Sequence, residues 1–266
     1  MTETLCSKAG TSRQFDESSI LARLKEAPGK IGFYYQDLNT GHSFGFQEDQ
    51  AFEAASVIKL PMFAAVMLFC QRGEASLDDK LLAKKADRVP PCGALYFFTD
   101  EPLVDIRTLC GLMITISDNT ATNMLMRHFG IDRFNAAFRE LGLEKTALNR
   151  LLFDAEASAA GKQNYICPRE MAELLEKIYR GTLVSGEASR FMEETLLLQQ
   201  INHKIPGYLN DAVPVAHKTG EDDGISNDVG IVYTREPFVV AFASNQTNVA
   251  EFEPLMRQIS LELSGL

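Results

Sequence analysis

Phe52-Glu-Ala-Ala-Ser56-Val-Ile-Lys59-Leu-Pro61 is the stretch that decides which fold and which chemistry to expect of this chain. Apolar residues recur with helical spacing from Ser56 to Gln71, so we predict a helix that begins near Ser56. Residues i and i+3 share one face of a helix, which brings the Lys59 amine beside the Ser56 hydroxyl. A serine attacks poorly until a neighbour accepts its proton, and a desolvated lysine with a lowered pKa can accept it. Ser56 is therefore the candidate nucleophile and Lys59 the candidate base, and the free N–H groups at the helix start would stabilise an oxyanion.

Two further motifs follow in a fixed order. Ser117-Asp118-Asn119 offers a hydroxyl that can relay a proton to a leaving amine and an Asn119 amide that can bind a substrate carbonyl. Lys218-Thr219-Gly220 offers positive potential, a hydroxyl for a substrate carboxylate and a residue that lets backbone come close. Alone, each motif also has a structural interpretation: a helix cap at Ser56, a turn or cap at Asp118-Asn119, and a solvated charge at Lys218. Because all three occur together, we interpret them as one catalytic site.

Strand patterns at the two ends of the chain flank a helical middle. We expect a helix over 17–27, strands over 31–38 and 42–47, helices over 56–71, 103–129, 132–141 and 169–179, strands over 224–234 and 238–244, and a closing helix over 251–263. This order predicts an α+β fold, in which an antiparallel sheet is assembled from both chain ends, flanked by helices, and interrupted by an inserted all-helical lobe. Clefts between lobes are common ligand sites.

The composition is that of a globular protein, with 45% hydrophobic and 23% charged residues among 266. A formal charge of −10 argues against nucleic acid and anionic membranes, since both are polyanions. We therefore expect a monomer that acts on a small molecule, without a membrane span. The polar N-terminus has no apolar signal-peptide core, which indicates a cytoplasmic protein unless a leader is missing. The scattered cysteines predict buried, reduced thiols rather than disulfides or a zinc site; they are Cys6, Cys70, Cys92, Cys110 and Cys167.

The three motifs, with their flanking residues, resemble those of the class A β-lactamase and penicillin-binding-protein superfamily. The resemblance runs from about residue 18 to the C-terminus and includes Leu112-Met-Ile-Thr-Ile-Ser117-Asp-Asn119-Thr-Ala-Thr-Asn123 and Val215-Ala-His-Lys218-Thr-Gly220. It implies a single domain over 18–266 after an N-terminal extension over 1–17. Within the domain it implies an α/β lobe from about 18–53 and 203–266, and a helical lobe over about 54–202.

The resemblance also implies acyl-enzyme chemistry at Ser56 and an oxyanion hole formed by the backbone N–H groups of Ser56 and Glu221. It implies no metal and no organic cofactor. It makes β-lactams the first substrates to consider, and a periplasmic or secreted location if a leader is missing.

The chain departs from the family where a loop glutamate holds the water that releases the product. That glutamate normally lies two residues after an arginine, and here Leu152 follows Arg150 at that spacing. Leucine cannot act as a base, so two nearby acids are candidates to compensate: Asp154, or Glu156, which falls near the place of the family's loop asparagine. The plainer interpretations are a structural contact for Asp154 and a solvated side chain for Glu156. A variant subfamily with an Arg-x-x-x-Asp loop, described only as serine hydrolases, resembles this chain more closely.

A second departure concerns the arginine that many class A enzymes place on the strand after the third motif to hold a substrate carboxylate. This chain has Asn227-Asp228 in that strand and no arginine until Arg235. His203 or Lys204 could replace it from a nearby loop, although an ordinary surface position is the plainer interpretation of each. His217, beside Lys218, is expected to pack under the strand.

These features leave three functions open. The first is hydrolysis of the β-lactam amide through a Ser56 acyl-enzyme. The second is a D-amino-acid peptidase or esterase on the same site, because an ester leaves without needing a protonated amine. The third is a protein that β-lactams acylate and that stays acylated, which Leu152 favours. A binding sensor of that kind would need a membrane or signalling domain, and we expect neither from this sequence.

Overall fold

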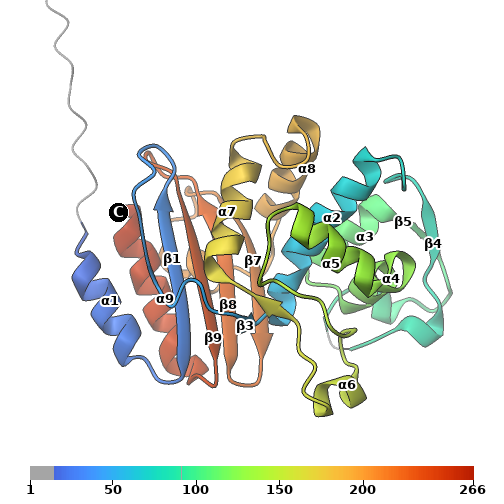
Figure 1. Cartoon of the computed structure of the whole chain (residues 1–266), viewed down its shortest axis with the longest axis horizontal. Coiled ribbons are helices and arrows are strands. Elements are labelled where there is room, and N and C mark those ends of the chain that lie inside the picture. The colour runs from blue at the N-terminus through green and yellow to red at the C-terminus, as the bar shows by residue number, and fades with distance from the viewer. Residues whose placement is uncertain (1–14, 91) are drawn as a thin grey trace, which may run out of the picture.

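The sheet joins the two ends of the chain, as the strand patterns predict. The structure, a computed structural model, describes residues 15–90 and 92–266. Five antiparallel strands run in the order β2-β1-β9-β8-β7 (Figure 1). Their bounds are β1 Lys30–Asp37, β2 Ser43–Phe46, β7 Val215–Asp222, β8 Ile225–Val232 and β9 Phe238–Asn245. β1 pairs with β9 along its whole length, from Lys30 opposite Asn245 to Asp37 opposite Phe238.

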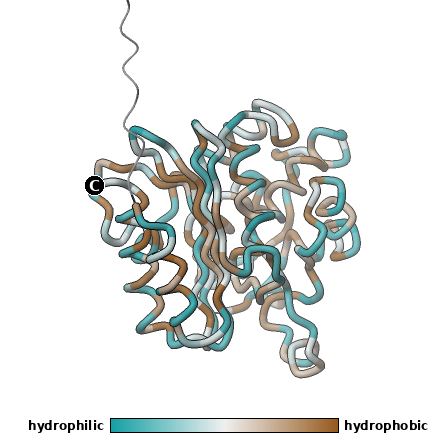
Figure 2. Tube along the Cα trace, turned by 60° about the vertical axis from the view of Figure 1, so that its left-hand side comes forward, coloured by the Kyte–Doolittle hydropathy of each residue, from teal (hydrophilic) through white to brown (hydrophobic). Residues whose placement is uncertain are grey.

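The sheet is buried on both faces because alternate side chains enter two different hydrophobic clusters. In β1, Phe33 and Tyr35 pack with the helices on the outer face, whereas Tyr34 belongs to the cluster on the inner face. The outer face is covered by α1 (Glu17–Glu26) and α9 (Val249–Ser264), which contribute buried residues such as Leu24 and Phe252. Hydrophobic positions concentrate in the central strands and hydrophilic ones on the outer turns (Figure 2).

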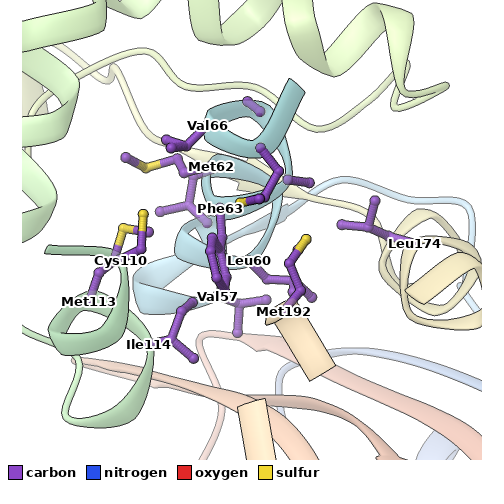
Figure 3. Packing of buried hydrophobic residues seen from close by; sticks show 14 of the residues in the cluster. Val57, Leu60, Met62, Phe63, Val66, Cys110, Met113, Ile114, Leu174 and Met192 are labelled. Atoms are coloured by element: carbon purple, nitrogen blue, oxygen red, sulfur yellow. The ribbon is translucent and has the colours of Figure 1, made fainter. Parts of the chain in front are cut away.

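The inner face of the sheet meets the helical part of the chain. α2 (Lys59–Gln71) is buried continuously from Lys59 to Met67, as expected of a helix that lies inside a core rather than on a surface. Side chains from other helices pack against it, and Ile114 and Met192 lie in the same hydrophobic cluster as Leu60 of α2 (Figure 3). The other helices are α3 Ile106–Thr115, α4 Asn119–Phe129, α5 Ile131–Glu140, α6 Ala155–Ala159, α7 Pro168–Tyr179 and α8 Gly186–Leu197. The short elements are β3 Phe52–Glu53, η1 Ala55–Ile58, β4 Lys80–Leu82, η2 Lys85–Asp87, η3 Leu95–Phe97, β5 Leu103–Asp105, β6 Tyr165–Ile166 and η4 Ile205–Tyr208.

The α+β class is confirmed, and most predicted elements are present with ends shifted by one or two residues. Three predictions are wrong in detail, one of them the single helix over 103–129, and one helix was missed. The helix expected from Ser56 begins as a 3₁₀ turn, η1, and becomes α-helical only at Lys59. The third motif lies inside a strand, β7, rather than on the approach to one. α8 is a separate helix that the sequence did not indicate.

The stretch over 103–129, predicted as one helix, is a short strand followed by two helices. α3 ends at Thr115, and Ser117 has a left-handed backbone with φ of 55°. Asp118 then caps α4, because its carboxylate accepts a hydrogen bond from the Ala121 N–H at 2.9 Å. Ser117 therefore lies in the short connection between α3 and α4 rather than inside a helix.

The division into lobes at the predicted boundaries stays a prediction. The predicted N-terminal extension and Cys6 fall almost entirely outside the described residues. In the described part of the chain, no helix combines the length and apolar character needed to cross a membrane.

Candidate active site

Ser56 sits in the 3₁₀ turn between a short strand and the central helix. Ala55 before it has a left-handed backbone with φ of 42°, an uncommon conformation for a residue with a side chain. The turn leaves Ser56 partly exposed, while the residues that follow it are buried. Lys59 begins α2, and its Nζ lies 2.9 Å from Ser56 Oγ. The structure thus brings together the serine and the lysine as their spacing predicts.

Lys59 is a buried amine surrounded by oxygen atoms. Besides Ser56 Oγ, its Nζ lies 2.8 Å from Ser117 Oγ, 2.9 Å from the Ser117 carbonyl oxygen and 2.8 Å from Asn119 Oδ1. An ammonium group has only three hydrogens for these four oxygens, whereas a neutral amine can accept one hydrogen bond from a hydroxyl. Burial holds the pKa of Lys59 well below its usual value of 10.5, and the nearby charge of Lys218 lowers it further. Lys59 therefore has the environment of a proton acceptor.

Ser117 lies between the two lysines of the site. The Nζ of Lys218 is 3.2 Å from Ser117 Oγ and 2.9 Å from the Thr219 carbonyl oxygen. Burial lowers the pKa of Lys218 from 10.5 to about 7, an effect that Asp228 partly opposes. The alternative interpretation of Lys218 as a solvated surface charge is wrong, because the residue is fully buried.

The third motif packs its backbone against the backbone of the nucleophile. A Cβ added at Gly220 would lie 2.9 Å from the Ala54 carbonyl oxygen and 3.1 Å from the Ser56 nitrogen. Only glycine permits this approach. β7 is the last strand of the five-stranded sheet, so one edge of it carries backbone groups that no strand of this sheet pairs. The predicted oxyanion hole, formed by the N–H groups of Ser56 and Glu221, falls where β7 meets η1.

The loop that carries Leu152 is fixed to the second motif's helix. The Asn123 side chain donates to the Leu152 carbonyl oxygen and accepts from the Leu152 N–H, both at 2.9 Å. Phe153 has a left-handed backbone with φ of 61° and is exposed. Arg150, the arginine that precedes Leu152, anchors the loop, since its guanidinium donates twice to Gln163 Oε1, at 2.8 and 3.0 Å.

The two acids of this loop have different positions. Asp154 is the N-cap of α6, and its Oδ1 accepts from the Ala157 N–H at 2.9 Å. It also lines the cavity beside Ser56. Glu156 is exposed and is not among the residues that line this cavity. The geometry therefore brings Asp154, but not Glu156, to the site.

A cavity of about 620 Å³ opens over these groups. The residues of the three motifs and the loop that line it include Ser56, Ser117, Asn119, Leu152, Thr219 and Glu221. A cavity of this size accommodates a drug-sized molecule.

Sequence reasoning missed two features around the site: a second set of contacts made by Asp118, and the exposure of Cys92. Asp118 is buried, and its Oδ2 accepts from the N–H groups of Ala94 (2.7 Å) and Leu95 (2.9 Å), which fixes the loop that carries Cys92. Cys92 is exposed and lines the cavity, so the expectation of a buried thiol is wrong there. The interpretation of Asp118-Asn119 as a turn or cap is confirmed for Asp118, which caps α4, but the sequence did not indicate its contacts to residues 94 and 95. Nothing in the sequence marked Cys92.

The loop and strand residues expected near the missing arginine are also placed. Lys204 is fully buried, so its interpretation as a surface residue is wrong. His217 packs under the strand as expected, where its Nδ1 lies 2.9 Å from Asp228 Oδ1. The described cysteines, Cys70, Cys92, Cys110 and Cys167, are all free thiols.

Comparison with known proteins agrees with this arrangement. The family model described as "Beta-lactamase enzyme family" matches residues 17–265. A β-lactamase of Rhodobacter capsulatus is 28% identical, over 89% of this chain and 82% of its own length. The crystal structure of a β-lactamase from Sphaerobacter thermophilus superimposes with a TM-score of 0.85 at 28% identity, covering 92% of this chain and 94% of that one. The structure of PBP-A gives a TM-score of 0.84 at 29% identity, covering 93% of each chain. A PBP-A mutant in which a leucine is replaced by glutamate is described as an acyl-enzyme complex with penicillin G.

The chain belongs to the β-lactamase enzyme family. Its fold and its relatives place it among the serine hydrolases of the class A β-lactamase type.

Proposed function

We propose that this enzyme opens β-lactam amides through an acyl-enzyme on Ser56. The observation that carries the proposal is the position of Lys59 Nζ, within 2.9 Å of both Ser56 Oγ and Ser117 Oγ. Lys59 takes the Ser56 proton as Ser56 Oγ bonds to the carbonyl carbon. The carbon–nitrogen bond then breaks, and the leaving nitrogen takes a proton from Ser117 Oγ, which regains one from the adjacent lysine amines.

The remaining contacts support binding and charge stabilisation. The N–H groups of Ser56 and Glu221 stabilise the oxyanion, and the Asn119 amide and Thr219 hydroxyl bind polar groups of the substrate. Gly220 supports the proposal because it permits the close approach that such a hole needs.

The release of the acyl group is slow in this proposal. Leu152 lines the cavity beside Ser56, where a base would have to hold water. Asp154 is the loop acid that lines this cavity, but one of its oxygens is engaged in capping α6. We infer that Ser56 is acylated faster than it is released, so that the acyl-enzyme accumulates.

A second candidate function is an esterase or D-amino-acid peptidase on the same site. The observation that favours it is the charge of the cavity lining, which includes four acids and a single arginine; these are Glu53, Asp154, Glu221, Asp222 and Arg150. β-Lactams such as penicillins carry a carboxylate, which this lining does not attract.

Incubation with a chromogenic cephalosporin separates these functions. Steady-state absorbance reports turnover, and intact mass reports the adduct on Ser56. A burst followed by slow turnover, with the adduct present, is the expected result. A stable adduct without turnover would indicate a protein that binds β-lactams covalently. If turnover and adduct are both absent, and a panel of esters is hydrolysed in a Ser56-dependent way, the second function replaces the β-lactam proposal. Ser56→Ala with full activity would overturn the assignment of the site.

A further inference from the structure

Lys204 is a cation buried behind the strand that carries the third motif. Its residue is fully buried, and it lies in the loop just before η4. Its Nζ is 3.0 Å from the Gly220 carbonyl oxygen and 3.3 Å from the Asn227 carbonyl oxygen. It thus fixes the backbones of β7 and β8 next to the site, one residue away from Glu221.

The third partner of Lys204 is the side chain of Glu221. Glu221 Oε1 lies 3.2 Å from Lys204 Nζ and 3.3 Å from His203 Nε2. The two carbonyl oxygens accept hydrogen bonds from the Lys204 ammonium group, and the Glu221 carboxylate forms an ion pair with it. The Glu221 side chain is 52% exposed and lines the cavity. Lys204 therefore meets the cavity only through a carboxylate that the protein itself supplies.

The other cations near the cavity are also engaged. Arg150 is the single arginine or lysine among the lining residues, and its guanidinium bonds Gln163 and the Leu151 carbonyl oxygen. Lys218 Nζ donates hydrogen bonds to Ser117 Oγ and to the Thr219 carbonyl oxygen. β8 contributes Asn227 and Asp228, both buried and both bonded within the protein. A substrate carboxylate would approach Glu221 with no uncommitted cation beside it.

We propose that Glu221 determines specificity by occupying, with its own carboxylate, the cation that would otherwise bind the carboxylate of a substrate. The inference rests on the proposed acylation of Ser56. The enzyme accordingly favours amides and esters whose acyl part is uncharged or cationic next to the scissile bond. Carboxylate-bearing β-lactams still acylate Ser56, but they bind more weakly, because like charges repel and Lys204 is already paired.

The test compares one scaffold in two charge states. A chromogenic cephalosporin is used as the free acid and as the methyl ester of its ring carboxylate, and the second-order rate constant of Ser56 acylation is followed by stopped-flow absorbance and intact mass. In the wild-type enzyme the ester reacts about tenfold faster than the acid, a factor that corresponds to about 1.4 kcal/mol. Glu221→Gln keeps the size and the backbone N–H of the residue and frees Lys204, so the acylation rate constant of the acid rises about tenfold relative to that of the ester.

Asp223→Asn is the matched control. Asp223 is exposed in the turn that follows β7, two residues after Glu221, and its substitution removes the same charge without the ion pair to Lys204. It leaves the ratio of ester to acid within about twofold of the wild-type value if the effect needs the direct contact with Lys204, because an isolated exposed charge contributes little. Thermal melts of both variants confirm that each is folded.

The outcomes are distinct. Equal rates for acid and ester in the wild-type enzyme, or the same response in Glu221→Gln and Asp223→Asn, would overturn the inference and leave the proposed function intact. A wild-type enzyme that neither form acylates would overturn the proposed function, and the inference with it. A relative rise in the acylation rate constant of the acid that occurs in Glu221→Gln but not in Asp223→Asn supports both the inference and the proposed function.

Discussion

Gly220 and Ser56 lie so close that a single methyl group at Gly220 would reach within 3.1 Å of the Ser56 nitrogen. The contact sets the separation between β7 and the 3₁₀ turn of the nucleophile, and with it the position of the predicted oxyanion hole. The hole works only if both N–H groups point at one oxygen. A shift of a few tenths of an ångström at this contact would therefore weaken the hydrogen bonds to the oxyanion and slow acylation.

Gly220→Ala is expected to lower the acylation rate constant by about 10²-fold, the loss typical for removal of one oxyanion donor. Stopped-flow acylation by a chromogenic cephalosporin measures it. Gly111→Ala serves as control, because a Cβ there meets nothing within 4 Å on α3. It should retain the rate and gain roughly 0.5–1 kcal/mol of stability. An unchanged rate in Gly220→Ala would show that this contact does not shape the hole.

Leu152→Glu is expected to accelerate deacylation by about 10²-fold or more, because it places a general base on a loop position that Asn123 already fixes at both its N–H and its carbonyl. Loss of the adduct from intact mass after removal of free substrate measures the rate. Ala159→Glu adds the same charge to an exposed position at the end of α6 and should have no effect. If both variants deacylate at the wild-type rate, the hydrolytic water does not approach the Ser56 acyl-enzyme from the loop that carries residue 152.

Asp154 offers a test that separates a structural role from a chemical one. Its Oδ1 caps α6, so Asp154→Ala should cost about 1 kcal/mol in urea unfolding, whereas Asp154→Asn, which can still cap, should cost little. We expect deacylation by the Asn variant to match the wild type. Deacylation that is slowed equally by Asn and Ala, with acylation preserved, would instead identify the carboxylate as the base.

The pH dependence of acylation should report Lys218. Its pKa is lowered to about 7, so the side chain is cationic below that pH and neutral above it. If its charge attracts and positions the substrate, the acylation rate constant falls as the pH rises through about 7. Lys218→Arg stays charged throughout and should lose this falling limb, whatever its absolute rate. A limb of the same midpoint in the Arg variant would assign it to another group.

The same shift has a consequence for stability. Between about pH 7 and the ordinary value of 10.5, the unfolded chain holds a proton on Lys218 that the folded chain does not. This residue therefore makes folding more favourable as the pH rises across that window. The effect appears as a rise in the urea midpoint, and the rise should be smaller in Lys218→Met, where only Lys59, whose pKa is also lowered, still contributes.

Much of the site could be predicted because its signals are local or belong to a motif. The Ser56–Lys59 pair follows from helical spacing, and the three motifs give the groups that surround Ser117. The sheet between the chain ends follows from the alternation in 31–38 and 238–244. Asp154 as a cap was also available locally, since Asp is a favoured N-cap and an alanine-rich segment follows it.

The rest depends on contacts between distant parts of the chain. The left-handed backbones of Ala55, Ser117 and Phe153 have no glycine to mark them and persist because the surrounding structure fixes them. A lysine is rarely buried, so nothing at Lys204 indicated that three oxygens from elsewhere would surround it. The monomeric state and the cellular compartment stay predictions.

The sheet that unites both ends of the chain has a consequence for biosynthesis. The nucleophile leaves the ribosome early, whereas β7, which presses Gly220 against it, is among the last strands made. At roughly 5–20 residues per second the two events are separated by on the order of ten seconds. During that interval the nascent chain carries Ser56 and Lys59 without Lys218 and without the strand edge that completes the predicted oxyanion hole. A message truncated before Val215 would yield a polypeptide that bears Ser56 but is no enzyme.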